Sequence, residues 1–152
     1  MQARMKNPAT VLPEVATGVK HLVKAANSTG LPGTTLELVH LRASQINGCS
    51  ACVWMASQGK NAAAGGEKLW AVSAWREAPC FDDAERAALS LAEHVTRLAD
   101  LNADAVPDEL WAELTKHYDE EQLAALTLWI ATTNFFNRLN ATVKEPAGTV
   151  WS

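Results

Sequence analysis

The stretch ELVHLRASQINGCSACVWMA, residues 37–56, decides how the rest of the sequence is interpreted. Its first half predicts a helix, and its second half predicts another helix that begins at Cys49. Between them Asn47-Gly48 predicts a turn, because both residues tolerate the left-handed conformation with which helices end. Cys49 and Cys52 are three residues apart, so on a helix they lie on one face. Two thiols in that arrangement can form a disulfide, and they are the strongest functional signal in the sequence.

The composition indicates one globular domain over residues 1–152. Of the 152 residues 48% are hydrophobic, which is enough for a substantial core. The net charge is -4 and the basic residues are scattered, which argues against nucleic acid or an anionic membrane as partner. The opening MQARMKNPAT lacks the apolar core of a signal peptide, and three cysteines are too few for a secreted disulfide framework. We therefore expect a cytoplasmic protein.

Helical periodicity runs through the chain, and no stretch has convincing strand character, so we expect an all-α fold. The predicted helices cover residues 11–27, 34–46, 49–58, 67–77, 82–99, 107–114 and a last long helix from 119. Residues 59–66 are expected to form a loop of small residues. The last helix carries no charge from 122 to 137 and is apolar on nearly all sides, which predicts burial in the core or in a homo-oligomer interface. It is too short and too polar near Asn134 for a membrane span.

The cysteine pair is also compatible with roles other than redox chemistry. A zinc site needs about four ligands, and beyond the pair the chain offers only Cys80 and four scattered histidines. A thioredoxin-like redox motif needs a βαβ scaffold, which the helical pattern does not provide. The structural alternative is two small buried hydrophobic residues, because cysteine is readily buried. If the pair is reactive, the helix start favours Cys49 as the thiolate, since unpaired backbone N–H groups stabilise negative charge there.

Further motifs accompany the pair along most of the chain. They are Glu37, LRAS at 41–44, AWREAP at 74–79, the ERAAL helix from Glu85, and NRLN at 137–140 after Asn134. Together they resemble the alkylhydroperoxidase D-like (AhpD-like) branch of the carboxymuconolactone decarboxylase family. The resemblance implies an AhpD-like helical fold with the CxxC at the N-terminus of a central helix. It also implies assembly into trimers, hexamers or related oligomers, and neither a metal nor an organic cofactor.

The same resemblance implies a thiol peroxidase or disulfide reductase with defined site residues. Cys52 would be oxidised by the hydroperoxide substrate, Cys49 would resolve it as a disulfide, and Glu37 would be the base. This order is opposite to the helix-start argument, but a nearby base outweighs a helix dipole that is typically worth about 0.3–1 kcal/mol. The implied electron donor is a thioredoxin-like or lipoyl-type partner.

The sequence departs from the family pattern at the proton relay. A histidine is expected one turn after the second cysteine, where this chain has Ala56, and some members have another where it has Ala51. Three explanations are open. Glu37 acts as the base directly or through water, or Ala56 is an engineered substitution, or the chain has lost peroxidase activity. His40 and His94 are the candidate substitutes, and each is expected to be an ordinary helix-surface or core-edge histidine.

Glu37 and its neighbours also admit a structural role. Glu37 has the spacing to Thr34 of a capping box. Ser44 and Asn47 are expected first to form hydrogen bonds at helix ends and second to support the site. Two other functions compete with the peroxidase. One is a carboxymuconolactone decarboxylase-like lyase, which needs no redox cycle. The other is a non-enzymatic module whose disulfide switches its assembly.

Overall fold

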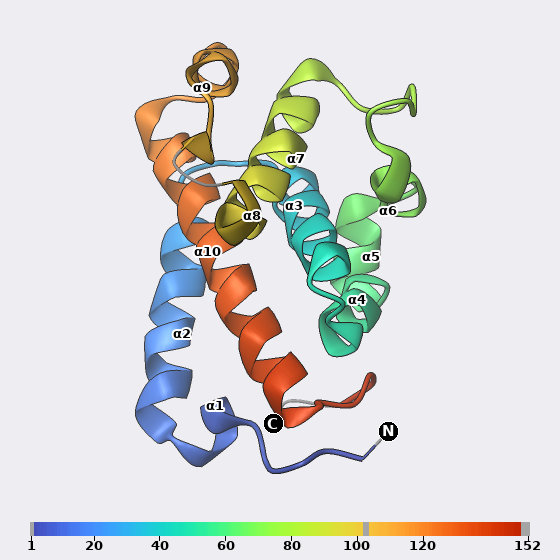
Figure 1. Ribbon diagram of the computed structural model, residues 1–152, viewed down its shortest axis with the longest axis vertical. Coiled ribbons are helices and arrows are strands. Elements are labelled where there is room, and N and C mark those ends of the chain that lie inside the picture. The colour runs from blue at the N-terminus through green and yellow to red at the C-terminus, as the bar shows by residue number, and fades with distance from the viewer. Residues whose placement is uncertain (1, 102–103, 150–152) are drawn as a thin grey trace.

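The computed structural model describes residues 2–101 and 104–149, and all regular secondary structure in these ranges is helical (Figure 1). The prediction of an all-α fold is confirmed. The elements are α1 (Pro8–Val11), α2 (Pro13–Ala26), α3 (Gly33–Ile46), α4 (Ser50–Ala56), α5 (Gly59–Gly65), α6 (Lys68–Ala71), the 3-10 turn η1 (Val72–Ala74), α7 (Asp83–Thr96), α8 (Leu98–Leu101), α9 (Asp108–Leu114) and α10 (Glu120–Val143).

Helix α3 is the centre of the bundle because it buries apolar side chains on opposite sides. Leu36 and Val39 belong to one hydrophobic cluster, which joins α3 to α7, α9 and α10. Leu38 and Leu41 belong to a second cluster, which joins α3 to α4, η1 and α7. Burial on both sides holds α3 firmly between its neighbours. The turn that follows α3 is therefore presented from a fixed support.

Helices α3 and α10 run side by side in the same direction. Near the N-terminal end of α3, Trp129 Nε1 of α10 donates a hydrogen bond of 2.8 Å to the carbonyl oxygen of Leu36. Two turns further on, Asn137 Nδ2 donates one of 3.0 Å to Ser44 Oγ. Both pairs are separated by 93 residues, and a constant separation is what parallel helices in register produce. This register brings the asparagine-rich end of α10 beside the turn after α3.

A buried carboxylate ties α3 and α7 to the segment after η1. Glu93 on α7 accepts hydrogen bonds from Arg42 on α3, from Trp75 Nε1 at 2.9 Å and from Arg76 at 2.7 Å. Burial by itself would raise the pKa of this carboxyl. The hydrogen bonds from Arg76, Trp75 and Arg42 outweigh burial and lower the pKa to about 2.

Several predicted boundaries are wrong. The loop predicted over 59–66 is instead helix α5 (Gly59–Gly65), because alanines favour a helix, and Gly66 ends it with a φ of 55°. The helix predicted over 67–77 is only α6 followed by η1, after which Arg86 binds the carbonyl oxygens of Trp75, Arg76 and Ala78. The first predicted helix, over 11–27, is α2, which begins at Pro13 and ends at Ala26, and the short helix α1 before it was not predicted.

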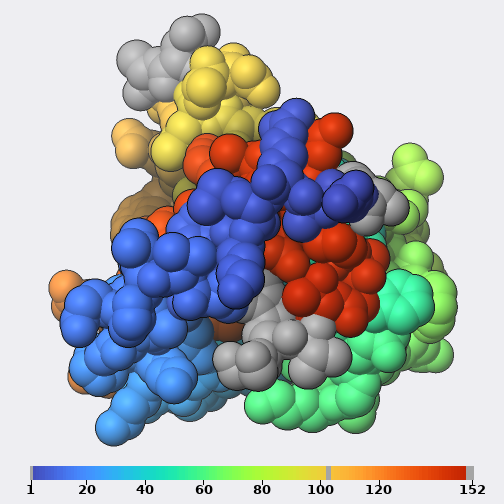
Figure 2. Space-filling model, turned by 90° about the horizontal axis from the view of Figure 1, so that it is seen from below, coloured from blue at the N-terminus to red at the C-terminus, as the bar shows by residue number. Residues whose placement is uncertain are grey.

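The chain before α1 lies across the C-terminal end of α10, as Figure 2 shows in blue and red. The backbone N–H of Arg4 donates to the carbonyl oxygen of Val143 at 2.8 Å, and the Arg4 guanidinium binds the carbonyl oxygen of Thr142. Asn7 is buried and caps α1 through its side chain. None of the helices in the described ranges combines the length and apolar character that crossing a bilayer requires.

Candidate active site

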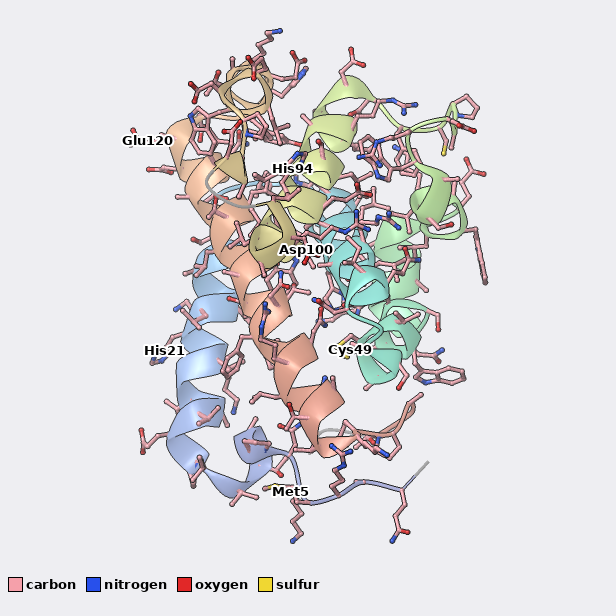
Figure 3. The ribbon with its side chains drawn as sticks, viewed as in Figure 1. Met5, His21, Cys49, His94, Asp100 and Glu120 are labelled. Atoms are coloured by element: carbon pink, nitrogen blue, oxygen red, sulfur yellow. A yellow bond between two sulfur atoms is a disulfide. The ribbon has the colours of Figure 1, made fainter. Side chains whose placement is uncertain are left out.

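The cysteine pair lies at the start of α4, directly after the turn that ends α3 (Figure 3). Gly48 has a φ of 64°, as the predicted turn requires. Cys49 is the N-cap of α4, and its sulfur accepts a hydrogen bond from the backbone N–H of Cys52. The two cysteines form a disulfide with Cα atoms 5.4 Å apart, and their exposed fractions are only 2% and 1%. The helix that begins here is α4, a short helix packed on the central α3, and not the central helix itself.

Two asparagine side chains from α10 form an amide cradle around the sulfurs. Asn137 Nδ2 and Asn140 Nδ2 each lie 3.2 Å from Cys52 Sγ, and Asn140 Nδ2 also lies 3.6 Å from Cys49 Sγ. Amide N–H groups that point at a sulfur stabilise a thiolate more than a neutral thiol. The amide cradle, Asn137 with Asn140, therefore stabilises negative charge on Cys52 more than on Cys49.

The orientation of Asn140 is fixed by groups behind it. Asn7 Nδ2 lies 3.1 Å from Glu145 Oε2 and 2.8 Å from Asn140 Oδ1. A carboxylate only accepts hydrogen bonds, so the Glu145 side chain holds the NH₂ group of Asn7 toward itself. The second hydrogen of that group then faces the oxygen of Asn140. The NH₂ group of Asn140 is left to face the sulfurs.

The other half of the cradle is oriented by the turn. Asn47 Nδ2 donates to Asn137 Oδ1 at 2.8 Å and to Asn134 Oδ1 at 2.9 Å, so the NH₂ group of Asn137 faces Ser44 and Cys52. The expectation that Ser44 and Asn47 serve first as helix-end hydrogen-bonding groups is wrong, because both side chains contact α10. The signal in the sequence was the spacing of Asn134, Asn137 and Asn140, three apart on one face of an otherwise uncharged helix.

Glu37 is buried on α3, and its carboxylate pairs with His40. Glu37 Oε1 lies 3.3 Å from His40 Nδ1, and neither side chain forms a hydrogen bond with either sulfur. The capping box is wrong, since α3 begins at Gly33 and Thr34 Oγ1 donates to the carbonyl oxygen of Ala64. His40 is not at the helix surface or core edge as expected, but is buried beside the Trp129 ring.

The remaining residues of the predicted relay lie as follows. Ala56 has an exposed fraction of 1% and packs in the hydrophobic cluster with Leu38 and Leu41, so an apolar methyl group occupies the position of the expected histidine. The Nδ1 atom of His94 lies 2.8 Å from the carbonyl oxygen of Ser90, within its own helix. The carboxylate of Glu37 and the imidazole of His40 thus pair on α3 and not on α4, the helix that carries Cys52.

Each sulfur borders its own cavity. Cys52 lines an apolar cavity of about 620 Å³ between α2, α4 and α10, whose other walls include Ala16, Val19, Met55 and Phe136. Cys49 lines a smaller hollow of about 320 Å³, whose other walls are Gly48, Ser50, Ala51, Asn140, Ala141, Lys144 and Glu145. Trp54, which is next but one to Cys52 in the sequence, lines neither cavity and has an exposed fraction of 51%.

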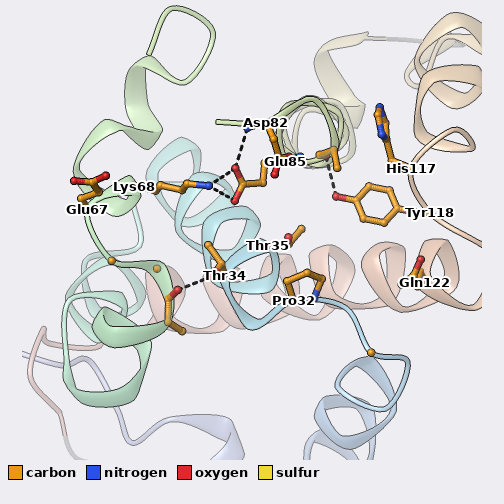
Figure 4. A pocket seen from close by; sticks show the side chains of 15 residues that line it. Pro32, Thr34, Thr35, Glu67, Lys68, Asp82, Glu85, His117, Tyr118 and Gln122 are labelled. Carbon is orange, nitrogen blue, oxygen red and sulfur yellow. Dashed lines mark hydrogen bonds and ion pairs between the residues drawn. The ribbon is translucent and has the colours of Figure 1, made fainter. Parts of the chain in front are cut away.

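A third hollow of about 570 Å³ opens between α3, α6 and α7, and neither cysteine of the pair lines it (Figure 4). Several of its polar side chains already have partners within the chain. Lys68 Nζ pairs with Glu85 at 2.6 Å, and the Tyr118 hydroxyl donates to the carbonyl oxygen of Ala84. Burial, with the charge of Asp82, raises the pKa of Tyr118 to about 12. Because no thiol lines this hollow and its Lys68, Glu85 and Tyr118 groups are already paired, it is a weaker candidate than the sulfur pair.

No group of three or more His, Cys, Asp or Glu side chains in residues 2–101 and 104–149 is arranged to hold a metal ion. The functional groups that the structure does bring together are the two sulfurs, the amide cradle and the apolar cavity. Cys80, the third thiol, is partly buried and unpaired within the described part of the chain.

Comparisons with known proteins give relatives that match most of the chain. The chain is 34% identical over 131 residues to the uncharacterized protein YdfG of Bacillus subtilis (strain 168), covering 86% of this chain and 87% of that protein. It is 36% identical over 111 residues to the uncharacterized protein YnjA of Escherichia coli (strain K12), covering 72% and 59%.

Two solved structures show the same fold. A protein of unknown function from Agrobacterium tumefaciens, described as a putative antioxidant defence protein AhpD, superimposes with a TM-score of 0.84 at 31% identity, covering 98% of this chain and 100% of that one. The debrominase Bmp8 superimposes with a TM-score of 0.78 at 22% identity, covering 92% and 74%, which shows the fold alone. The model of the carboxymuconolactone decarboxylase family matches residues 13–94. The chain therefore belongs to the carboxymuconolactone decarboxylase family, in its AhpD-like branch.

Proposed function

We propose that this protein is a thiol-dependent alkyl hydroperoxide reductase whose Cys49–Cys52 pair cycles between dithiol and disulfide. The observation that carries the proposal is the surroundings of Cys52. Its sulfur receives two amide hydrogen bonds and borders a cavity of about 620 Å³ with mainly apolar walls. The first feature favours a thiolate, and the second suits the organic part of a hydroperoxide.

The proposed reaction uses both sulfurs in turn. The Cys52 thiolate attacks the outer oxygen of the hydroperoxide, the O–O bond breaks, and the alkoxide leaves with a proton as an alcohol. Cys52 is then a sulfenic acid. The Cys49 thiol attacks it, a disulfide forms, and water is released. Two electrons pass from the thiols to the hydroperoxide, and a thioredoxin-like or lipoyl-type dithiol returns them.

Glu37 keeps the role of base in this proposal, acting through His40. The two side chains form a buried pair, and His40 lies one helical turn before Ser44 on the same face of α3. Ser44 Oγ and Cys52 Sγ share a neighbour, since Asn137 Nδ2 is 3.0 Å from the first and 3.2 Å from the second. Water between His40 and Ser44 would complete a route for the proton. His40 thus replaces the imidazole that Ala56 lacks.

We also propose that the chain works as a homo-oligomer, a trimer or a hexamer. Phe135 on α10 and Trp111 on α9 have exposed fractions of 40% and 44%. Trp111 also lines an apolar groove together with Leu128 and Ala131 of α10, and a contiguous apolar surface of this kind is typical of a covered interface. Light scattering coupled to size-exclusion chromatography measures the assembly directly, and a monomeric elution at micromolar concentration would contradict it.

The test of the function is a thiol titration before and after stoichiometric cumene hydroperoxide, in a Cys80→Ser background so that only the pair reports. We expect two thiols to be lost as an intramolecular disulfide and Cys52→Ser to abolish the loss. Thiols that survive in the parent protein would overturn the peroxidase. A lyase would then be indicated by unchanged thiols in an active protein. An assembly switch would be indicated by a change of oligomeric state on oxidation without turnover.

A further inference from the structure

The two cysteines of the disulfide line different cavities. The apolar cavity contacts Cys52, and the smaller hollow contacts Cys49. Among the described residues, only Ala51 and Asn140 line both. The exposed fractions of the two cysteines are nearly equal, so exposure does not distinguish them. The walls around each sulfur do distinguish them.

The hydrogen bonds also differ between the sulfurs. Cys52 Sγ has two amide donors at 3.2 Å, from Asn137 and Asn140. Cys49 Sγ has the Asn140 amide at 3.6 Å and the backbone N–H of Cys52 at 3.4 Å. In thiol–disulfide exchange one sulfur is attacked and the other leaves as a thiolate, and the better stabilised thiolate leaves faster. The amide cradle therefore makes Cys52 the better leaving group.

We propose that the reductant attacks Cys49 from the smaller hollow and that Cys52 leaves as a thiolate held by the amide cradle. A thiolate of the reductant forms a new S–S bond with Cys49 while the Cys49–Cys52 bond breaks. A second thiolate of the same dithiol then attacks the reductant's own sulfur in that mixed disulfide and frees Cys49. The reductant ends as a disulfide, and each cysteine takes up one proton. This assignment rests on the proposed redox cycle.

The shape of the smaller hollow indicates what kind of reductant reaches Cys49. Gly48, Ser50 and Ala141 give its rim small side chains, and Gly48 and Ser50 are exposed. Its volume of about 320 Å³ is at the small end of the range for ligand pockets. Its charged walls are Lys144 and Glu145, and the Glu145 carboxylate is hydrogen-bonded by Asn7. A slender dithiol arm fits this opening.

Separate entrances have a direct consequence for turnover. The hydroperoxide approaches through the apolar cavity and the dithiol through the smaller hollow, so the two substrates need not displace each other. Filling one entrance should therefore slow one half of the cycle only. Ala16 on α2 lines the apolar cavity but not the smaller hollow, and Ala141 on α10 lines the smaller hollow but not the apolar cavity. Neither residue contributes a reacting group.

The experiment identifies the attacked sulfur by mass spectrometry. The Cys80→Ser protein is oxidised with diamide, so the disulfide forms whether or not hydroperoxides are substrates. It is then pulsed with 2-mercaptoethanol and quenched with N-ethylmaleimide. We expect the mixed disulfide on Cys49 and the maleimide on Cys52 in most molecules. The reverse labelling, or an even mixture, would overturn the proposal.

Two matched variants give a second measurement. Ala141→Phe should slow reduction of the diamide-formed disulfide by dihydrolipoamide several-fold and leave oxidation by cumene hydroperoxide unchanged. Ala16→Phe should do the opposite. Equal effects of Ala141→Phe on both half-reactions would count against separate entrances. If cumene hydroperoxide fails to oxidise the pair but the reductant still attacks Cys49, the proposed hydroperoxide reductase function is wrong, whereas the assignment of Cys49 as the attacked sulfur is still supported.

Discussion

Removing one donor of the amide cradle should make the Cys52 thiolate harder to form. Asn140→Ala deletes the Nδ2 group that lies 3.2 Å from Cys52 Sγ and leaves Asn7 bound to Glu145. A hydrogen bond to a charged group contributes about 1.5–3 kcal/mol, and one pH unit corresponds to about 1.4 kcal/mol. The pH midpoint for thiolate formation should therefore rise by about 1–2 units.

The assay follows thiolate absorbance at 240 nm against pH, in a Cys49→Ser, Cys80→Ser background where only Cys52 titrates. Asn140→Asp, which replaces the donor with a carboxylate of the same size, should raise the midpoint further. Asn27→Ala is the matched control, because the side chain of Asn27 only caps its own helix. A midpoint unchanged in Asn140→Ala, in a protein with an unchanged circular dichroism spectrum, would refute the cradle as the stabilising element.

Three other changes test separate parts of the structure. Ala56→His should lower the free energy of unfolding by about 1–3 kcal/mol, because it overfills a packed apolar cluster, and denaturant titration measures this effect. The same change should speed oxidation by cumene hydroperoxide, which stopped-flow fluorescence follows. An unchanged oxidation rate would count against a reaction limited by proton transfer. His40→Gln should slow that oxidation while leaving dithiol reduction of the disulfide unchanged, and equal slowing of both would indicate a structural role. Glu93→Gln should cost roughly 3 kcal/mol at pH 7, since the folded pKa of about 2 lies well below the ordinary value of 4.5. A lowered pKa stabilises the fold above pH 4.5 and loses that effect as pH falls toward 2, so urea unfolding at pH 7 and at pH 3 should show the difference between parent and variant shrinking. A difference that stays constant with pH would contradict the ion-pair account.

The all-α fold and the disulfide could be predicted because both depend on local sequence. Helical periodicity identified α7 and α10, and the spacing of Cys49 to Cys52 identified the sulfur pair. The short helices were harder, because their boundaries depend on tertiary partners. After α6 and η1 the chain forms a turn, and its carbonyl oxygens accept hydrogen bonds from Arg86, which is eight to eleven residues further along the chain.

The surroundings of the sulfurs could not be predicted in the same way. Asn137 and Asn140 are about ninety residues from the cysteines, and only the parallel register of α3 and α10 brings them there. A single sequence shows that α10 has asparagines on one face, but it does not show which element that face meets. The pairing of Glu37 with His40 was missed for a different reason. Thr34 offered a simpler local partner, and the structure gives Thr34 another one.

The hydrogen bond between Asn7 and Asn140 couples the N-terminal segment to the cysteine pair, because Asn140 also contacts Cys52. If docking of residues 2–7 helps to orient the donor that faces the sulfurs, then by thermodynamic reciprocity the state of the sulfurs must alter how firmly those residues dock. Forming a thiolate should tighten this arm, and loss of the negative charge should loosen it. Amide hydrogen exchange at Arg4 would then report the redox state from a position that touches neither cysteine. An affinity tag placed before Asn7 is, by the same reasoning, a modification of the active site.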